Sequence, residues 1–117
     1  MPFSLDGRVA LVTGSSTGLG KAVAFGLARS GARVALNYFN NEERANNTFA
    51  EFEAAGCEGA MIRANVTDED EVNRLVSEAS EKLGPIDIVV LNATPDQPQK
   101  SIEEYDWDFY QSMLDFF

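Results

Sequence analysis

The chain has 117 residues and a formal net charge of −10 at pH 7, and this length suffices for one domain with its own hydrophobic core. The acidic excess lies entirely in residues 64–117, which carry thirteen acidic and three basic side chains, whereas residues 1–63 carry six of each. This distribution argues against nucleic acids and anionic membranes as partners. The electrically neutral first half can still receive a phosphate-bearing ligand.

Cysteine content and the first residues of the chain predict a cytoplasmic protein. The single cysteine, Cys57, cannot form an internal disulfide, which is typical of a protein in a reducing compartment. Residues 1–6 lack the basic and apolar segments of a signal peptide, and no apolar run in the sequence approaches the length that spans a membrane.

Apolar runs bounded by turn residues predict four short strands, and the amphipathic stretches that follow them predict four helices. In chain order the strands are expected at residues 8–12, 34–38, 60–64 and 86–91, and the helices at residues 18–30, 42–55, 67–83 and 101–117. Gly31 is expected to end the first helix as a C-cap glycine, and Thr67 is expected to open the third helix with a capping box.

This alternation predicts an α/β fold. Short apolar strands separated by helices form a parallel sheet that is covered on both faces, and right-handed crossovers make such a sheet doubly wound. No linker, repeat or low-complexity segment interrupts the pattern. We therefore expect residues 1–117 to form a single Rossmann-type domain with the element order β-α-β-α-β-α-β-α.

A glycine-rich segment joins the first predicted strand to the first predicted helix, with the sequence Thr13-Gly14-Ser15-Ser16-Thr17-Gly18-Leu19-Gly20. Gly14 allows a turn conformation that other residues avoid. Gly18 lets the backbone approach phosphates closely, and Gly20 allows tight packing of the helix on the strand. Three hydroxyl side chains add hydrogen-bond donors: Ser15, Ser16 and Thr17. Because a helix N-terminus also attracts anions, the segment predicts a site for the pyrophosphate of a dinucleotide.

The spacing excludes a nucleoside triphosphate site. A Walker loop requires G-x-x-x-x-G-K-[ST], and around Gly20-Lys21 the first glycine is replaced by Ser15 and the final Ser/Thr by Ala22. A glycine-rich turn that binds nothing is the structural alternative, and the strand and helix on either side of the segment favour the dinucleotide. No metal-ligand spacing is present, and the sequence contains no histidine.

The sequence resembles the short-chain dehydrogenase/reductase family over essentially the whole chain. The resemblance rests on the glycine segment, on the strand at residues 33–38, on Asn65-Val66 after the third strand and on Asn92-Ala93 after the fourth. It implies an NAD- or NADP-dependent oxidoreductase that acts on a small alcohol or carbonyl substrate. Residues 34–38 are especially similar to bacterial carbonyl reductases such as the 3-oxoacyl carrier-protein reductases.

The resemblance also implies which residues bind the cofactor. It places the pyrophosphate on the glycine segment, through Gly14, Ser16, Thr17, Gly18, Leu19 and Gly20. Tyr38 stands near the position of the acid that binds the adenosine ribose in NAD-dependent relatives, and no acid adjoins it. This favours NADP, with NAD as the alternative. Arg44 either reaches the 2′-phosphate or is a solvated arginine on the helix surface, and the second interpretation is preferred.

Two asparagines follow the third and fourth strands. In the resemblance Asn65, with Val66, occupies the place of an Asp that accepts a hydrogen bond from adenine, and an asparagine carbonyl can accept the same bond. A turn role is the equal alternative, because asparagine is common in turns. The resemblance also implies that Asn92 and Ala93 belong to the cofactor-binding residues, and Asn92 is expected to stabilise the strand ends rather than to touch the substrate. Thr94 replaces a family glycine and resists positive φ.

The catalytic residues that the resemblance implies are absent from this chain. Family chemistry uses a Tyr, a Lys four residues later and a Ser, which lie downstream of this region in relatives. The chain contains no Tyr-x-x-x-Lys, and Leu114 stands near the position of a further family Asn. We therefore expect no catalytic residue here, and we expect the chain to be the N-terminal half of a longer family domain or a truncated product.

The last predicted helix is rich in apolar and aromatic residues from Tyr105 to Phe117, too many for an exposed terminus. In relatives this helix packs in a subunit interface, so a homo-oligomer is expected. Two other functions stay open. One is a non-catalytic nucleotide-binding or regulatory relative that acts with a partner chain, favoured by Thr94 and the missing Asn. The other is an interaction module that acts through this aromatic helix.

Overall fold

The structure is a computed structural model that describes residues 4–93 together with Trp107 and Asp108. Four parallel strands form one sheet: β1 (Val9–Val12), β2 (Arg33–Tyr38), β3 (Gly59–Arg63) and β4 (Ile88–Val90). Their order across the sheet is β3-β2-β1-β4. The α/β, doubly wound fold predicted from the sequence is confirmed over these residues.

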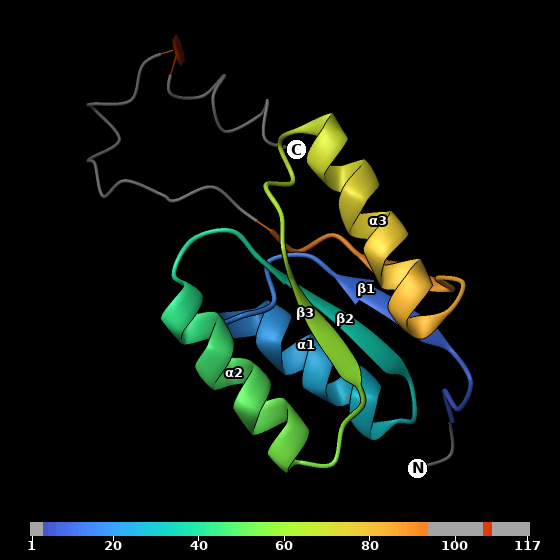
Figure 1. Ribbon diagram of the computed structural model, residues 1–117. Helices are drawn as coiled ribbons and strands as arrows, with labels where there is room; N and C mark the ends of the chain where they lie inside the picture. The colour runs from blue at the N-terminus through green and yellow to red at the C-terminus, as the bar shows by residue number, and fades with distance from the viewer. Residues whose placement is uncertain (1–3, 94–106, 109–117) are drawn as a thin grey trace.

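Within residues 4–93, helices α1 (Gly18–Arg29), α2 (Glu42–Ala54) and α3 (Glu69–Leu83) cover the two faces of the sheet (Figure 1). Helices α1 and α2 pack on one face, where Phe25 and Phe52 lie in a buried cluster with Val34 and Leu36 of β2. Helix α3 covers the other face with a second cluster. The two faces explain why the strands are apolar on both sides.

The fourth strand is shorter than predicted. The sequence predicts a strand over residues 86–91, but only Ile88–Val90 pair with β1, in register with Ala10 to Val12. Asp87 instead binds the start of β1, because its carboxylate accepts a hydrogen bond from the Val9 N–H at 3.0 Å. At the other end of the run, Leu91 is 83% exposed. The pairing partner, rather than apolar composition, therefore sets the length of this strand.

The N-cap of α3 differs from the prediction. Asp68, not Thr67, is the N-cap, and its side chain accepts hydrogen bonds from the N–H groups of Asp70 at 2.9 Å and Glu71 at 3.4 Å. The Thr67 hydroxyl donates instead to the Asn65 side chain. The predicted capping box is thus wrong by one residue. Thr67 and Asp68 are both good N-cap residues, but Thr67 is hydrogen-bonded to Asn65 in the preceding turn and does not cap the helix.

Replacing Asp68 by alanine is expected to lower the free energy of unfolding by about 1 kcal/mol, the usual effect of removing a helix N-cap. Asp70→Ala is the matched control. It removes the same negative charge two residues further along, in the first turn of α3, and leaves the N-cap in place. Chemical denaturation of both variants measures the difference. Equal losses in the two variants would mean that charge, and not capping, matters at this helix end.

The predicted last helix, residues 101–117, falls almost wholly outside the described residues. Only Trp107 and Asp108 are described there, and both are helical and exposed. The expectation of an oligomer interface on this helix therefore stays a prediction. Among the described residues, no helix combines the length and the apolarity needed to cross a bilayer.

Candidate dinucleotide-binding site

The glycine segment forms the loop between β1 and α1 at the carboxyl edge of the sheet. Gly14 has φ +59° and Gly18 has φ +61°, a backbone conformation that favours glycine. A Cβ on Gly14 would lie 2.8 Å from the Cα of Ala93, whereas a Cβ on Gly18 would meet no atom within 4 Å. Gly14 thus allows close packing inside the protein, and Gly18 faces open space that a ligand can occupy.

Gly20 lies where α1 crosses the loop that precedes it. A Cβ there would collide with the carbonyl oxygen of Gly14 and would lie 2.5 Å from Nδ2 of Asn92. The Asn92 amide donates to that same Gly14 carbonyl at 3.1 Å. The absence of a side chain at residue 20 therefore allows three segments, β1, α1 and the end of β4, to meet at one point.

The N-terminus of α1 is built differently from those of α2 and α3. Its N-cap residue, Thr17, makes no side-chain capping hydrogen bond, and no acidic residue lies in the first turn. By contrast, Asn41 caps α2 and Asp68 caps α3, and both helices carry acidic residues in their first turns. The first N–H groups of α1 thus lack a side-chain cap, and the positive end of the helix is not neutralised.

Ser15 does not add a free hydroxyl donor to the loop, contrary to the prediction. Its side chain is completely buried. Its Oγ donates to the carbonyl of Val12 at 2.8 Å and accepts from the N–H of Asn37 at 2.9 Å. Ser16 is also buried, and its carbonyl accepts a 2.6 Å hydrogen bond from the Thr48 hydroxyl of α2. Of the three hydroxyl residues, Thr17 is the exposed one.

The end of β4 is bonded to the end of β1. The Thr13 hydroxyl accepts hydrogen bonds from the N–H groups of Asn92 at 3.0 Å and of Ala93 at 3.1 Å. Together with the bond from the Asn92 amide to Gly14, these contacts agree with the prediction that Asn92 stabilises the strand ends. Thr94, which replaces a family glycine, lies outside the described residues.

The carboxyl end of β2 carries no acidic side chain. Tyr38 is half-buried, and Phe39 after it is 39% exposed. Arg63 at the end of β3 lies over the Phe39 ring, 5.0 Å from its centroid, and donates to the Phe39 carbonyl at 3.2 Å. Arg44 is exposed in the first turn of α2, as expected for a solvated arginine. The arginine held beside the end of β2 is therefore Arg63, which the sequence analysis did not single out.

Asn65 forms a turn at the start of the β3–α3 connection. Its side-chain carbonyl accepts two hydrogen bonds from Thr67, at 3.0 Å from the N–H and 2.6 Å from the hydroxyl. The turn role is thus the one that the structure shows, and an adenine amino group would have to displace the threonine hydroxyl. Val66 is half-buried and packs against the core beneath α3. The adenine contact stays a prediction.

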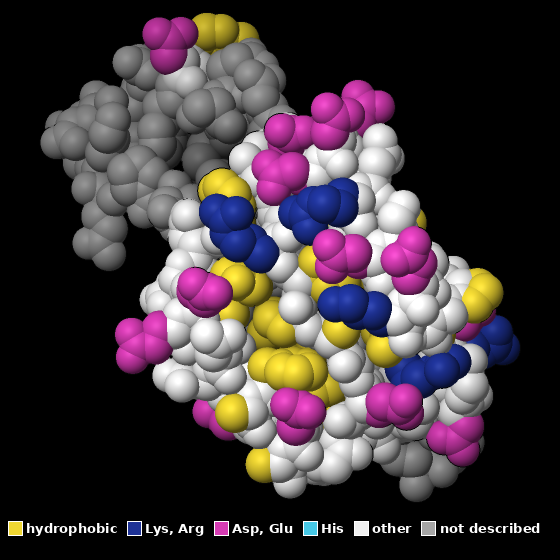
Figure 2. Space-filling model, in the orientation of Figure 1, with side chains coloured by type: hydrophobic (Ala, Val, Ile, Leu, Met, Phe, Trp, Pro, Cys, Tyr) yellow, Lys and Arg dark blue, Asp and Glu magenta, His cyan; other side chains and the backbone are white. Residues whose placement is uncertain are grey.

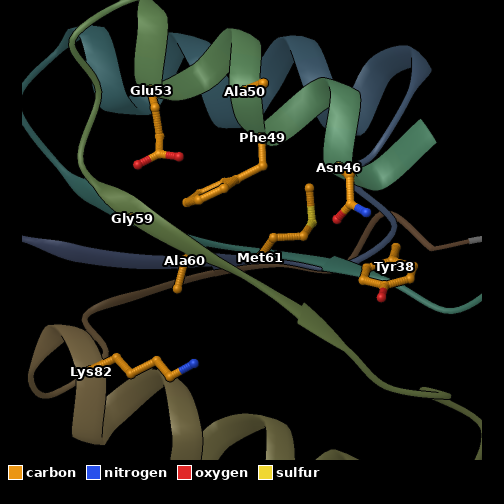
Figure 3. Close-up of a pocket in the computed structure, with 9 residues that line it drawn as sticks. All are labelled: Tyr38, Asn46, Phe49, Ala50, Glu53, Gly59, Ala60, Met61 and Lys82. Atoms are coloured by element: carbon orange, nitrogen blue, oxygen red, sulfur yellow. The ribbon is translucent and has the colours of Figure 1, made fainter. Parts of the chain in front are cut away.

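A pocket of about 510 Å³ lies elsewhere, between α2 and the free edge of β3 (Figure 3). Phe49 and Met61 form its apolar floor, and Glu53 and Lys82 project toward it from α2 and α3 (Figure 3). Hydrophobic side chains are visible between the two helices, with acidic and basic side chains around them (Figure 2). Of the predicted site residues only Tyr38 lines it. The pocket shares Tyr38, at the carboxyl end of β2, with the candidate cofactor site, but none of its lining residues belongs to the glycine loop.

The order of the strands locates the site independently. From β1 the chain builds the sheet through β2 and β3 in one direction, and it then returns to place β4 on the opposite side of β1. The glycine loop after β1 and Asn92-Ala93 after β4 therefore flank the switch point of the sheet, where doubly wound proteins bind nucleotides. Within the described residues, no three His, Cys, Asp or Glu side chains are placed to hold a metal ion.

Comparisons with known proteins agree with this architecture. A family profile described as short chain dehydrogenase matches residues 8–115. The hydroxynaphthalene reductase-like protein Arp2 of Metarhizium majus is 40% identical over 109 residues, a match that covers 92% of this chain and 41% of the relative.

Solved structures show the same similarity. A dehydrogenase/reductase from Sinorhizobium meliloti 1021 has a TM-score of 0.85 at 36% identity, covering 97% of this chain and 44% of its own. A blue fluorescent protein from a metagenomic library, solved in complex with NADPH, has a TM-score of 0.81 at 33% identity, covering 97% of this chain and 46% of its own. The chain thus spans less than half the length of these relatives. It belongs to the short-chain dehydrogenase family.

Proposed function

We propose that this chain is the dinucleotide-binding part of an NAD(P)-dependent oxidoreductase that interconverts a small alcohol and a carbonyl compound in the cytoplasm. The observation that carries the proposal is the N-terminus of α1. It has no side-chain cap and no acidic first turn, it follows a glycine loop with two positive-φ glycines, and it lies at the switch point of the sheet. Its N–H groups suit the pyrophosphate of the cofactor.

The described residues fit such a cofactor. The open space at Gly18 admits a phosphate next to the backbone. The half-buried Tyr38 lies at the end of β2, where the adenosine ribose binds in this fold, and Asn65 with Val66 follows β3 on the adenine side. When bound, the nicotinamide would supply the hydride, and these residues would hold and orient the adenosine and pyrophosphate.

The 117 residues by themselves are expected to bind the cofactor weakly at best and to turn over no substrate. They contain no Tyr-x-x-x-Lys for proton transfer. The proposed oxidoreductase activity therefore belongs to the whole protein, whose relatives are more than twice as long as the matched region.

We also propose that NADP is the preferred cofactor. Residues 37–41, the last two residues of β2 and the three that follow it, contain no carboxylate to repel a 2′-phosphate. Arg63 adds a positive charge beside Phe39. The solved relative from a metagenomic library, which contains NADPH, supports the same choice.

Replacing Tyr38 by aspartate is expected to reverse this preference. A carboxylate there would accept hydrogen bonds from the ribose hydroxyls of NAD and repel the 2′-phosphate of NADP. Titration of the protein with NADPH and NADH, followed by nucleotide fluorescence, measures both affinities. We expect the wild-type chain to favour NADPH and Tyr38→Asp to change the ratio by about tenfold or more toward NADH. Tyr38→Phe is the control, and an unchanged ratio in the aspartate variant would remove Tyr38 from the ribose site.

A second candidate function is a non-catalytic nucleotide-binding or regulatory relative that acts with a partner chain. Thr94 in place of the family glycine, and Leu114 near the place of a family Asn, favour it. Sequencing the complete reading frame separates the two functions. A Tyr-x-x-x-Lys after residue 117 supports the oxidoreductase, and its absence supports the second candidate.

A further inference from the structure

Asn37 is a buried polar residue at the centre of the candidate site, although it was not among the residues that the sequence pointed to. It is the penultimate residue of β2, and only 2% of its surface is exposed. Both ends of its side-chain amide, and both groups of its backbone peptide, are hydrogen-bonded to neighbouring segments. A buried amide with all of its groups in use suggests a specific structural task.

One side of Asn37 binds the glycine loop. Its Oδ1 accepts from the Gly14 N–H at 3.0 Å. Its N–H donates to the Ser15 hydroxyl at 2.9 Å, and its carbonyl accepts from the Ser15 N–H at 2.9 Å. Three hydrogen bonds therefore attach the first two residues after Thr13 to the end of β2, and the Gly14 N–H is directed inward rather than toward a ligand.

The other side of Asn37 binds the end of β3. Its Nδ2 lies 3.3 Å from the carbonyl of Ile62 and 3.2 Å from that of Ala64, with the Tyr38 carbonyl also at 3.3 Å. Ala64 leads directly into Asn65 and Val66. The orientation of the amide is unambiguous, since reversing it would place an NH₂ group against an N–H and an oxygen against carbonyls.

We infer that Asn37 is a positioning residue that holds the pyrophosphate loop and the adenine-side turn of the cofactor site in one fixed relation. The inference rests on the function proposed above. The oxygen of this side chain must accept a hydrogen bond from the glycine loop while its nitrogen donates to carbonyls at the end of β3. An asparagine does both, whereas a carboxylate has no donor and a serine is too short to span the two segments. No titratable side chain is among its hydrogen-bond partners.

Asn37→Asp is the sharpest test, because it changes one amide nitrogen to oxygen at nearly constant shape. An ionised carboxylate would face the carbonyls of Ile62 and Ala64. We expect a thermal midpoint lower by about 5 °C or more, and an NADPH affinity about tenfold or more weaker at a temperature where the variant is fully folded. Asn47→Asp, at an exposed position on α2, is the control for the added charge.

The effect of Asn37→Asp should depend on pH in a way that a general loss of packing would not. Burial raises the pKa of the introduced carboxyl above its unfolded value. The protonated carboxyl has a donor again, so the folded state of the variant is most stable, relative to the control, below that raised pKa. The deficits in thermal midpoint and NADPH affinity relative to Asn47→Asp should therefore be largest at pH 8 and shrink toward pH 5.

The outcomes separate this inference from the proposed function. If wild-type protein binds no NADPH, the proposed function fails, and with it the part of the inference that concerns the cofactor. If wild-type protein binds NADPH but Asn37→Asp binds it equally well, or shows the same pH profile as Asn47→Asp, the positioning role is overturned. Should Asn37→Asp not fold, Asn37→Ser provides the affinity test without a new charge, and wild-type affinity in that variant would equally refute the role.

Discussion

Replacing Gly20 by alanine is expected to weaken dinucleotide binding strongly and to destabilise the domain. The added Cβ would collide with the Gly14 carbonyl and approach the Asn92 amide, both of which are held by hydrogen bonds and cannot move independently. Relieving the collision must displace the start of α1 from the loop. We expect a loss of about 1–3 kcal/mol in unfolding free energy, typical of overpacking, and an affinity for NADPH at least tenfold weaker.

Gly26→Ala is the matched control for this experiment. Gly26 lies in the same helix, and a Cβ there would meet no atom within 4 Å. Because alanine favours a helix interior over glycine, this variant should gain about 0.5–1 kcal/mol in stability. NADPH titration measures the affinity of both variants, and chemical denaturation measures their free energies of unfolding. Unchanged NADPH binding in Gly20→Ala would show that the contact of α1 with the loop does not shape the site.

Phe52→Ala is expected to have the largest effect on stability. Phe52 is the largest completely buried side chain among the described residues. Its ring packs edge-on against Phe25 at 5.3 Å between centroids and stacks on Phe49 at 6.0 Å. It also lies beneath Gly59, whose Cβ position is 3.0 Å from the ring. Truncation leaves a cavity between α1, α2 and β3, and we expect a loss of about 3–5 kcal/mol.

A loss of that size is a large part of the stability of a small domain. Urea unfolding followed by circular dichroism measures it. Phe39→Ala is the comparison variant, since Phe39 is 39% exposed and its contact with Arg63 is worth about 1 kcal/mol or less. Similar losses in the two variants would mean that the cluster around Phe52 does not dominate the core.

Local patterns in the sequence were enough to predict much of this protein. The order of strands and helices, the parallel sheet and the glycine loop all follow from apolar periodicity and from residues that act on their neighbours along the chain. Helix α1 ends at Arg29 with Ser30 as its C-cap, and Gly31 follows with φ +109°, so the glycine expected at this helix end lies one residue after the cap. These features depend on the backbone preferences of a few adjacent residues, so the sequence contains them directly.

Other features depended on residues that are distant in the chain. The Ser15 oxygen accepts from the N–H of Asn37, 22 positions away, while its proton goes to the nearby Val12 carbonyl. The length of β4 was decided by its pairing with β1. The cap of α3, by contrast, was decided between near neighbours, because the Thr67 hydroxyl donates to Asn65 two residues before it and Asp68 is left as the cap.

The candidate site shows the same division. Its glycines were recognisable from their spacing, because a turn between a strand and a helix needs residues without a side chain at particular positions. Asn37 was not recognisable, because its importance comes from carbonyls on β3 and an N–H on the glycine loop that only folding brings together. The sequence by itself determined which fold forms and where the cofactor loop lies. Only the tertiary structure decided which polar side chains are free to bind a ligand, because hydrogen bonds between segments determine which polar groups remain available.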